Sequence, residues 1–328
     1  MQHTLTQLPL VCLFSCAVLS QLAAAQATSS REQNAPPDAQ RIVFLGDSIT
    51  HAGAYIEAIE TAMLVQYPER HIEFLNLGLP SETTSGLSEP GHAGGKFPRP
   101  HLQERLNRVL DKAQPNLVVA CYGMNCGMYY PLSDAHFAKF KEGIQNLHSE
   151  VEKRGAQIIH LTPALFDPVP IRARLLPAGL ESYPQPYEGY DDVLDAYSSW
   201  LLSRRQDGWQ VLDVHGAMEQ ALAKKRVTEP EFTFARDGVH PNAEGQAVLA
   251  QPLAAAWGLK LDERALPAHP QSQAILKLVS EKQKVLKLAW LTATGHQRPG
   301  IAAGLSIEEA QVVAASLDAR ARQLVSAN

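Results

Sequence analysis

The stretch RIVFLGDSIT at residues 41–50 indicates the fold of the whole chain. Residues 41–45 are a short apolar run with β-branched members, and Gly46 closes it, as is typical of a buried parallel strand. Apolar residues at helical spacing follow at 54–65. A strand that turns directly into a helix is the opening of a βαβ unit, so this stretch predicts an α/β protein.

The same alternation recurs along the chain. Four further apolar runs close on turn residues, at 72–77, 117–122, 157–161 and 210–214, the last near Gly216. Helical patterns accompany them at 102–110, 137–151, 194–202 and 243–257. Right-handed crossovers between such strands give a parallel sheet covered on both faces. The predicted fold class is therefore a three-layer α/β/α sandwich with a five-stranded parallel sheet, in which ligands bind beyond the carboxyl ends of the strands.

The N-terminal residues have the pattern of an export signal. An apolar segment at 8–22 precedes three alanines at 23–25, which predicts a signal peptide over 1–25 and a secreted or periplasmic protein with no stable membrane insertion after cleavage. An uncleaved anchor and a lipoprotein signal at Cys16 are the alternatives. Residues 26–40 are polar and contain proline, so they are expected to form a flexible linker.

Composition limits the remaining possibilities. A chain of 328 residues with 45% hydrophobic content suits one large domain with an appendage, here 41–260 followed by a helical extension at 261–328. Ser306 and Glu309 predict a capping box that opens the second helix of this extension. The net charge of −5 comes without a basic patch, so a nucleic-acid partner is not expected, whereas the oligomeric state is open. Cys121 and Cys126 are expected to be free thiols.

Two motifs at predicted element ends carry the residues of a hydrolytic site. Ser48 ends the turn after the first strand, where its hydroxyl is exposed and a helix N-terminus favours negative charge. Asp237 precedes His240 by three residues, which lets the carboxylate orient the imidazole. The plainer alternatives are an N-cap turn at 46–48 and a surface histidine at a helix start. A metal site at the Asp–His pair is a poorer alternative because no third ligand is apparent, and neither a metal nor a cofactor is expected.

Two further residues lie where other predicted strands end. Gly78 can offer a backbone N–H and Asn125 a side-chain amide to the same edge of the sheet. With the Ser48 N–H they would make three convergent donors for an oxyanion, although each alone is more often a turn residue.

The order of these motifs resembles the SGNH, or GDSL-like, hydrolase family over about residues 41–256. The resemblance rests on Gly-Asp-Ser-Ile at 46–49, the glycine of Asn-Leu-Gly at 76–78, Gly-Met-Asn-Cys at 123–126 and Asp-Gly-Val-His at 237–240. It implies a flavodoxin-like SGNH fold with Ser48 as nucleophile, His240 as base, Asp237 as its orienting group, and Ser48, Gly78 and Asn125 as oxyanion donors. Cys126 departs from the family, which usually has Asp there.

The sequence therefore predicts a serine esterase that uses no cofactor. Short acyl esters, chiefly acetyl, on a small molecule or polysaccharide are the expected substrates. A lipid or arylester hydrolase is the alternative within enzymes, and a non-catalytic carbohydrate-binding or scaffold protein is the alternative of another class. A proline- and tyrosine-rich segment at 164–192 is expected at the active-site edge. The candidate substrate contacts are Asp47, Tyr129, Tyr130, Tyr187 and Tyr190, although these aromatic residues can equally serve to pack the segment against the core.

Overall fold

A five-stranded parallel sheet forms the centre of the molecule in a computed structural model that describes residues 35–327. The strands follow the order β2-β1-β3-β4-β5, so the chain crosses over once at β1. Their bounds are β1 Arg41–Gly46, β2 Glu73–Asn76, β3 Leu117–Cys121, β4 Gln157–Leu161 and β5 Gln210–Leu212. All residues of β3 are buried, as expected of a central strand covered on both faces. The predicted sheet is confirmed.

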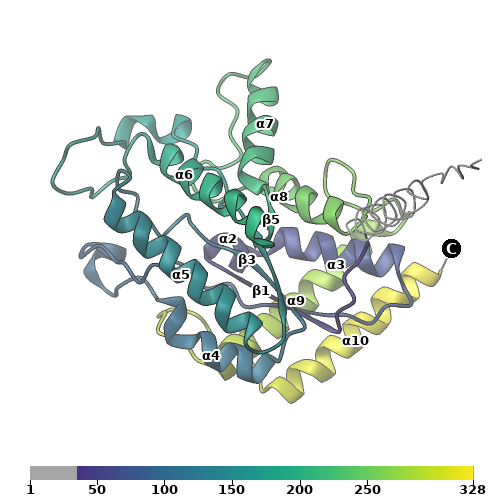
Figure 1. The fold of residues 1–328 in the computed structure, drawn as a ribbon. Coiled ribbons are helices and arrows are strands. Elements are labelled where there is room, and N and C mark those ends of the chain that lie inside the picture. The colour runs from purple at the N-terminus through teal and green to yellow at the C-terminus, as the bar shows by residue number, and fades with distance from the viewer. Residues whose placement is uncertain (1–34, 328) are drawn as a thin grey trace, which may run out of the picture.

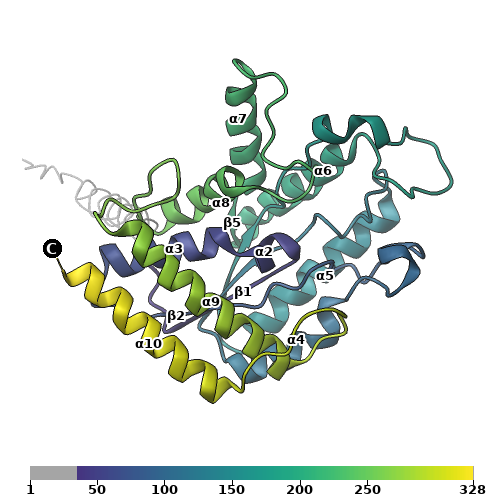
Figure 2. The same cartoon turned by 180° about the vertical axis from the view of Figure 1, so that it is seen from behind.

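Helices cover both faces of this sheet (Figures 1 and 2). Their bounds are α2 Ser48–Ala52, α3 Ala54–Gln66, α4 Leu102–Ala113, α5 Asp134–Glu152, α6 Tyr190–Ser203, α7 Val214–Arg226, α8 Ala243–Ala256, α9 Ser272–Thr294 and α10 Ile307–Ser326. Short 3₁₀ turns lie at η1 His92–Gly95, η2 Val169–Arg174 and η3 Arg204–Asp207. Figure 1 shows α4, α5 and α6 on the near face, and Figure 2 shows α3, α8 and α9 on the other. The α/β/α sandwich is confirmed.

The helix α7 was not predicted. The fifth strand ends at Leu212, and α7 begins two residues later because the Asp213 side chain accepts a hydrogen bond from the Gly216 N–H at 2.9 Å. Gly216 therefore lies inside a helix rather than in the turn that the sequence indicated. A Cβ there would lie 2.5 Å from the capping carboxylate, which explains the glycine.

The C-terminal extension packs on the sheet layer instead of standing apart from it. Leu286, Ala289 and Trp290 of α9 are buried in the main hydrophobic core, and α10 packs along α9. The capping box predicted at Ser306 and Glu309 opens α10. Thus α9 lies along the β2 edge of the sheet and packs against α3 and α4 (Figure 2).

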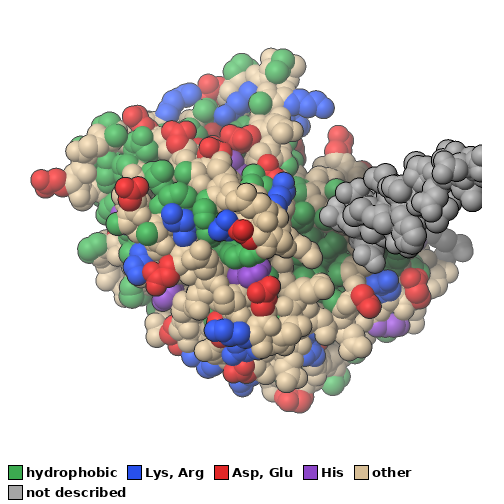
Figure 3. All heavy atoms as spheres, in the orientation of Figure 1, with side chains coloured by type: hydrophobic (Ala, Val, Ile, Leu, Met, Phe, Trp, Pro, Cys, Tyr) green, Lys and Arg blue, Asp and Glu red, His purple; other side chains and the backbone are tan. Residues whose placement is uncertain are grey.

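The surface and the N-terminal region complete the description. Acidic and basic side chains are interspersed over the face in Figure 3. Among residues 35–327 no helix is long and apolar enough to cross a membrane. The predicted signal peptide, 1–25, and most of the predicted linker, 26–40, lie outside the described residues.

Candidate active site

Three predicted side chains meet in a continuous hydrogen-bonded chain at the carboxyl edge of the sheet. The Ser48 Oγ lies 2.8 Å from His240 Nε2, and His240 Nδ1 lies 2.7 Å from Asp237 Oδ2. Ser48 is the first residue of α2, immediately after β1, and the other two precede α8. An imidazole held between a hydroxyl and a carboxylate can take the hydroxyl proton and stabilise the resulting positive charge.

The loop that carries Asp237 and His240 is shaped by its own hydrogen bonds. Asp237 Oδ1 accepts the backbone N–H groups of Val239 and His240 at 2.9 and 2.8 Å. Partial burial would raise the pKa of Asp237, but hydrogen bonds from His240 and Val239 lower it below its usual value. The carboxylate therefore stays ionised beside the imidazole. The Asp237 and His240 side chains are each about half exposed, at 50% and 51%, so solvent and substrate can reach them.

Gly238 fixes the position of this loop against the segment at 164–192. Its φ of 81° lies in the left-handed region, and a Cβ would come within 2.8 Å of the Asp167 carbonyl oxygen. The Asp167 N–H donates to the Gly238 carbonyl at 2.8 Å. Part of the 164–192 segment thus lies at the site, as the sequence predicted.

Asp47 is buried beneath the serine instead of lining the surface. It is 3% exposed and accepts the Ile49 N–H at 3.0 Å as the N-cap of α2. Burial raises the pKa of its carboxyl to about 6, and the Ile49 N–H opposes this rise. This geometry contradicts Asp47 as a substrate contact, because the carboxylate is turned into the protein.

Gly78 allows α2 to pass close to the end of β2. A Cβ on Gly78 would lie 2.4 Å from the His51 nitrogen. Its N–H donates to Asn76 Oδ1 at 3.0 Å, so this amide already has an acceptor, which the sequence did not indicate. Behind it, the buried Arg105 donates to the Leu77 carbonyl at 2.7 Å and pairs with the buried Glu82.

The side-chain amide of Asn125 is held in a single orientation by Arg99, a residue that the sequence analysis did not single out. Arg99 donates to Asn125 Oδ1 at 2.8 Å, which leaves the buried Asn125 Nδ2 without a hydrogen-bond partner. Both oxygens of Glu89 bind the same guanidinium at 2.7 Å. Burial would lower the pKa of Arg99, but Glu89 raises it overall, so the cation is permanent. Arg99 and Glu89 thereby select the amide orientation that presents a donor.

The turn after Asn125 is strained and is held by aromatic neighbours. Met128 and Tyr129 both have positive φ, 56° and 62°, which is unusual for residues other than glycine. The Tyr129 carbonyl accepts the Tyr187 N–H at 2.9 Å, and the Arg99 guanidinium lies over the Tyr129 ring. Such strain persists only where the surroundings hold it.

The candidate aromatic contacts divide into two groups. Tyr129, Tyr130 and Tyr187 are partly exposed, whereas Tyr190 is fully buried and donates to the Met124 carbonyl at 2.8 Å. Tyr190 therefore packs the segment against the Asn125 loop, and its assignment as a substrate contact was wrong. Tyr130 lies against Tyr183 with ring centroids 5.1 Å apart.

The two cysteines of the described region are free, as expected. Cys126 is buried, and its sulfur accepts the Thr84 N–H at 3.4 Å. The thiol thus links the Asn125 turn to the loop after β2, at the position where the resemblance expected an aspartate. Burial raises its pKa.

A cavity of about 260 Å³ opens elsewhere, between the C-terminal helices and the β2 edge. Glu60, Phe74, Lys282 and Asp318 are among its lining residues, and none of the hydrolytic residues contributes to it. The Asp237 and His240 side chains, each about half exposed, instead face solvent.

The comparison with protein families gives the class that this fold and site define. The model of the GDSL-like lipase/acylhydrolase family matches residues 44–248, which is more than half of the chain. The chain therefore belongs to this family of hydrolases. No curated protein matches the sequence.

Solved structures share the fold at low identity. The acetylxylan esterase Axe2 from Geobacillus stearothermophilus is 18% identical with a TM-score of 0.51, covering 70% of this chain and 97% of that one. A gut microbial diltiazem-metabolizing enzyme is 19% identical with a TM-score of 0.54, covering 69% of this chain. This chain spans 49% of that enzyme's length.

Proposed function

We propose that the protein is a serine esterase that removes short acyl groups, chiefly acetyl, from carbohydrates. The observation that carries the proposal is the pair of contacts on His240, 2.8 Å to Ser48 Oγ and 2.7 Å to Asp237 Oδ2. A non-catalytic binding protein has no need of a serine hydroxyl aligned with an oriented imidazole.

The contacts support an acyl-enzyme mechanism without a cofactor. His240 Nε2 takes the Ser48 proton as Oγ attacks the ester carbonyl, whose oxygen becomes the oxyanion. Its donors would be Asn125 Nδ2 and the Ser48 N–H at the start of α2, with Gly78 N–H as a third if it shares its bond to Asn76. The C–O bond to the sugar then breaks, and the leaving oxygen takes the proton from His240. Water, activated by the same imidazole, releases the acid and restores Ser48.

Three observations support a carbohydrate ester. The fold is shared with an acetylxylan esterase, and variants of Axe2 described as catalytic mutants change a serine, an aspartate and a histidine. Tyr129, Tyr130 and Tyr187 are partly exposed beside Asn125, and aromatic faces suit sugar rings. The signal pattern at 1–25 supports export to a place where polysaccharides occur.

The chemistry is tested with a fluorophosphonate probe and p-nitrophenyl acetate. We expect the parent protein to be labelled, and Ser48→Ala to be unlabelled. We expect Ser48→Ala and His240→Ala each to lower kcat by about 10⁴-fold or more. Near-parental hydrolysis by either folded variant would exclude the triad, whereas a folded parent protein that is neither labelled nor active would favour the non-catalytic alternative.

The substrate class is tested separately, with nitrophenyl esters of increasing chain length beside acetylated xylan and acetylated monosaccharides. We expect the highest kcat/KM for acetyl esters and release of acetate from at least one sugar. A preference for octanoyl esters with no acetate released from any sugar would favour the lipid or arylester alternative instead.

A further inference from the structure

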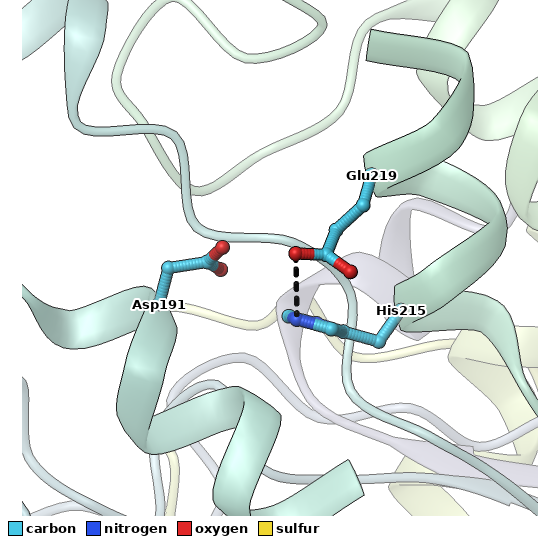
Figure 4. Close-up of side chains that lie close together, drawn as sticks. All are labelled: Asp191, His215 and Glu219. Atoms are coloured by element: carbon cyan, nitrogen blue, oxygen red, sulfur yellow. Dashed lines mark ion pairs between the residues drawn. The ribbon is translucent and has the colours of Figure 1, made fainter. Parts of the chain in front are cut away.

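A second cluster of polar side chains lies between α6 and α7. Asp191 is the second residue of α6, and His215 and Glu219 lie one turn apart on α7. One ligand atom from each lies within 4.8 Å of those of the other two. Figure 4 shows the two carboxylates and the imidazole pointing toward a common space.

His215 has no ordinary structural explanation for its burial. It is 1% exposed, and neither ring nitrogen makes a hydrogen bond of normal geometry in the described structure, although the Pro163 carbonyl lies close enough to act on the ring. Its Nε2 lies 4.0 Å from Glu219 Oε1, too far for a hydrogen bond. Leaving a buried polar group unpaired is costly, so a ligand for the ring is expected.

The charge around the ring favours a cation as that ligand. Asp195, Asp213 and Glu219 all act on His215 as negative charges. Asp191 accepts the Phe166 N–H at 2.8 Å and brings its carboxylate against the ring beside that of Glu219. Two crowded carboxylates beside an unpaired imidazole are relieved by a positive ion between them.

We propose that Asp191, His215 and Glu219 bind one divalent transition-metal ion of the Zn²⁺ class. An imidazole ligand disfavours Ca²⁺ and Mg²⁺, which take oxygen ligands. Zn²⁺ takes nitrogen at about 2.0–2.1 Å and carboxylate oxygen at about 2.0–2.2 Å, so small side-chain rotations close the site. The Pro163 carbonyl beside the ring is suited to accept the remaining ring N–H.

The ion would join two helices beneath the hydrolytic loop. Asp191 binds the backbone of Phe166, and the next residue, Asp167, donates to the Gly238 carbonyl. Metal binding at this cluster is therefore expected to stabilise the segment that supports Asp237 and His240. This proposal is independent of the esterase activity. It revises the expectation of no metal, which was drawn where no third ligand was apparent at the Asp237–His240 pair.

The test uses the full chain, freed of metal with a chelator and then dialysed against Zn²⁺. Bound zinc is counted by mass spectrometry, thermal unfolding is followed with and without Zn²⁺, and Co²⁺ is added as a spectroscopic probe. The variants are Asp191→Asn and Glu219→Gln, which keep side-chain size. The matched control is Glu152→Gln on α5, because His148 and Glu152 have the same spacing and a 3.2 Å contact without a third carboxylate.

We expect one Zn²⁺ per chain, a rise in Tm with Zn²⁺, and a Co²⁺ absorption band in the parent and in Glu152→Gln. Asp191→Asn and Glu219→Gln should lose the ion, the Tm rise and the band. Absence of bound zinc in the parent, or equal retention by the parent and both cluster variants, would overturn the proposal whatever the esterase assays give.

Discussion

At the scale of single residues, the orientation of the Asn125 amide is set by the groups that bind its oxygen. Because Arg99 occupies Oδ1, the buried Nδ2 is free to meet a developing negative charge. We expect Asn125→Ala to cost about 3 kcal/mol of transition-state stabilisation, seen as a loss in kcat with little change in KM. Steady-state kinetics with p-nitrophenyl acetate measure this, and Asn146→Ala on the exposed face of α5 serves as control. Equal kcat for Asn125→Ala and parent would remove Asn125 from the proposed oxyanion hole.

Asp47 gives a prediction about pH. Its pKa is raised from 3.8 to about 6, so its charged form is disfavoured in the folded state. Its cost to stability is absent below about pH 4, grows as pH rises through 6, and is complete above that, at about 3 kcal/mol. We expect Asp47→Asn, which keeps an N-cap oxygen, to raise the free energy of unfolding at pH 8 but not at pH 4. Denaturant unfolding at the two pH values measures this, and an equal effect at both would contradict it.

At the scale of elements, the loop from β2 to α4 supports the two proposed donors, Gly78 and Asn125, through two ion pairs. Arg105 with Glu82 holds the carbonyl before Gly78, and Arg99 with Glu89 orients Asn125. Both glutamates lie in the loop itself, so the loop supplies the negative charges that neutralise the two arginines. Removing one partner of such a buried pair leaves an uncompensated charge.

We therefore expect Arg99→Met to lower kcat about as far as Asn125→Ala does, with KM little changed. Arg99→Lys should not rescue it, because an ammonium cannot span Glu89 and Asn125 as the planar guanidinium does. If Arg99 acts only through Asn125, the double variant should be no slower than Asn125→Ala alone. If the double variant instead lost kcat by the product of the two single losses, that positioning role would be contradicted. Arg154→Met, which removes an arginine bound to Asp111 and Glu150, is the control.

At the scale of the whole molecule, the C-terminal helices pack against the sheet, and we expect them to stabilise it more than they complete the site. Trp290 of α9 is 3% exposed within the main core, and Lys287 donates to the His51 carbonyl at the end of α2. We expect Trp290→Ala to lower the free energy of unfolding by about 3–5 kcal/mol while kcat below the new Tm stays near parental. Val312→Ala, at a 73% exposed position, should change neither. A folded Trp290→Ala protein without esterase activity would show that the extension contributes to the chemistry.

The domain boundary at residue 260 remains a prediction, and it can be tested with a shortened chain. A chain that ends there would expose the β2 edge of the sheet and the apolar residues of α3 that α9 covers. We expect such a chain to lose cooperative thermal unfolding, as measured by calorimetry. A sharp transition near the parental Tm would show that residues 41–260 fold without the extension.

The sequence by itself determined the sheet, most helices and the residues that meet around Ser48. Apolar periodicity is local, so five strands and their flanking helices could be predicted from it. Parallel strands end at one edge, so residues that follow different strands, such as Ser48 and Asn125, were expected together. The helix α7 was missed because Gly216 looks like a turn residue until Asp213 caps the helix.

Only the tertiary structure decided which polar residues are buried and what they touch. Arg99, Glu89 and Arg105 look like solvated loop or helix charges in the sequence, yet segments distant in the chain enclose them. Tyr190 looked like a surface aromatic for the same reason. Asp191 and His215 lie 24 positions apart and become neighbours only when α6 and α7 pack. Burial depends on the whole fold, whereas residue spacing reflects only the local chain. The sequence could therefore predict which residues meet at the site, but not which buried residues hold them in place.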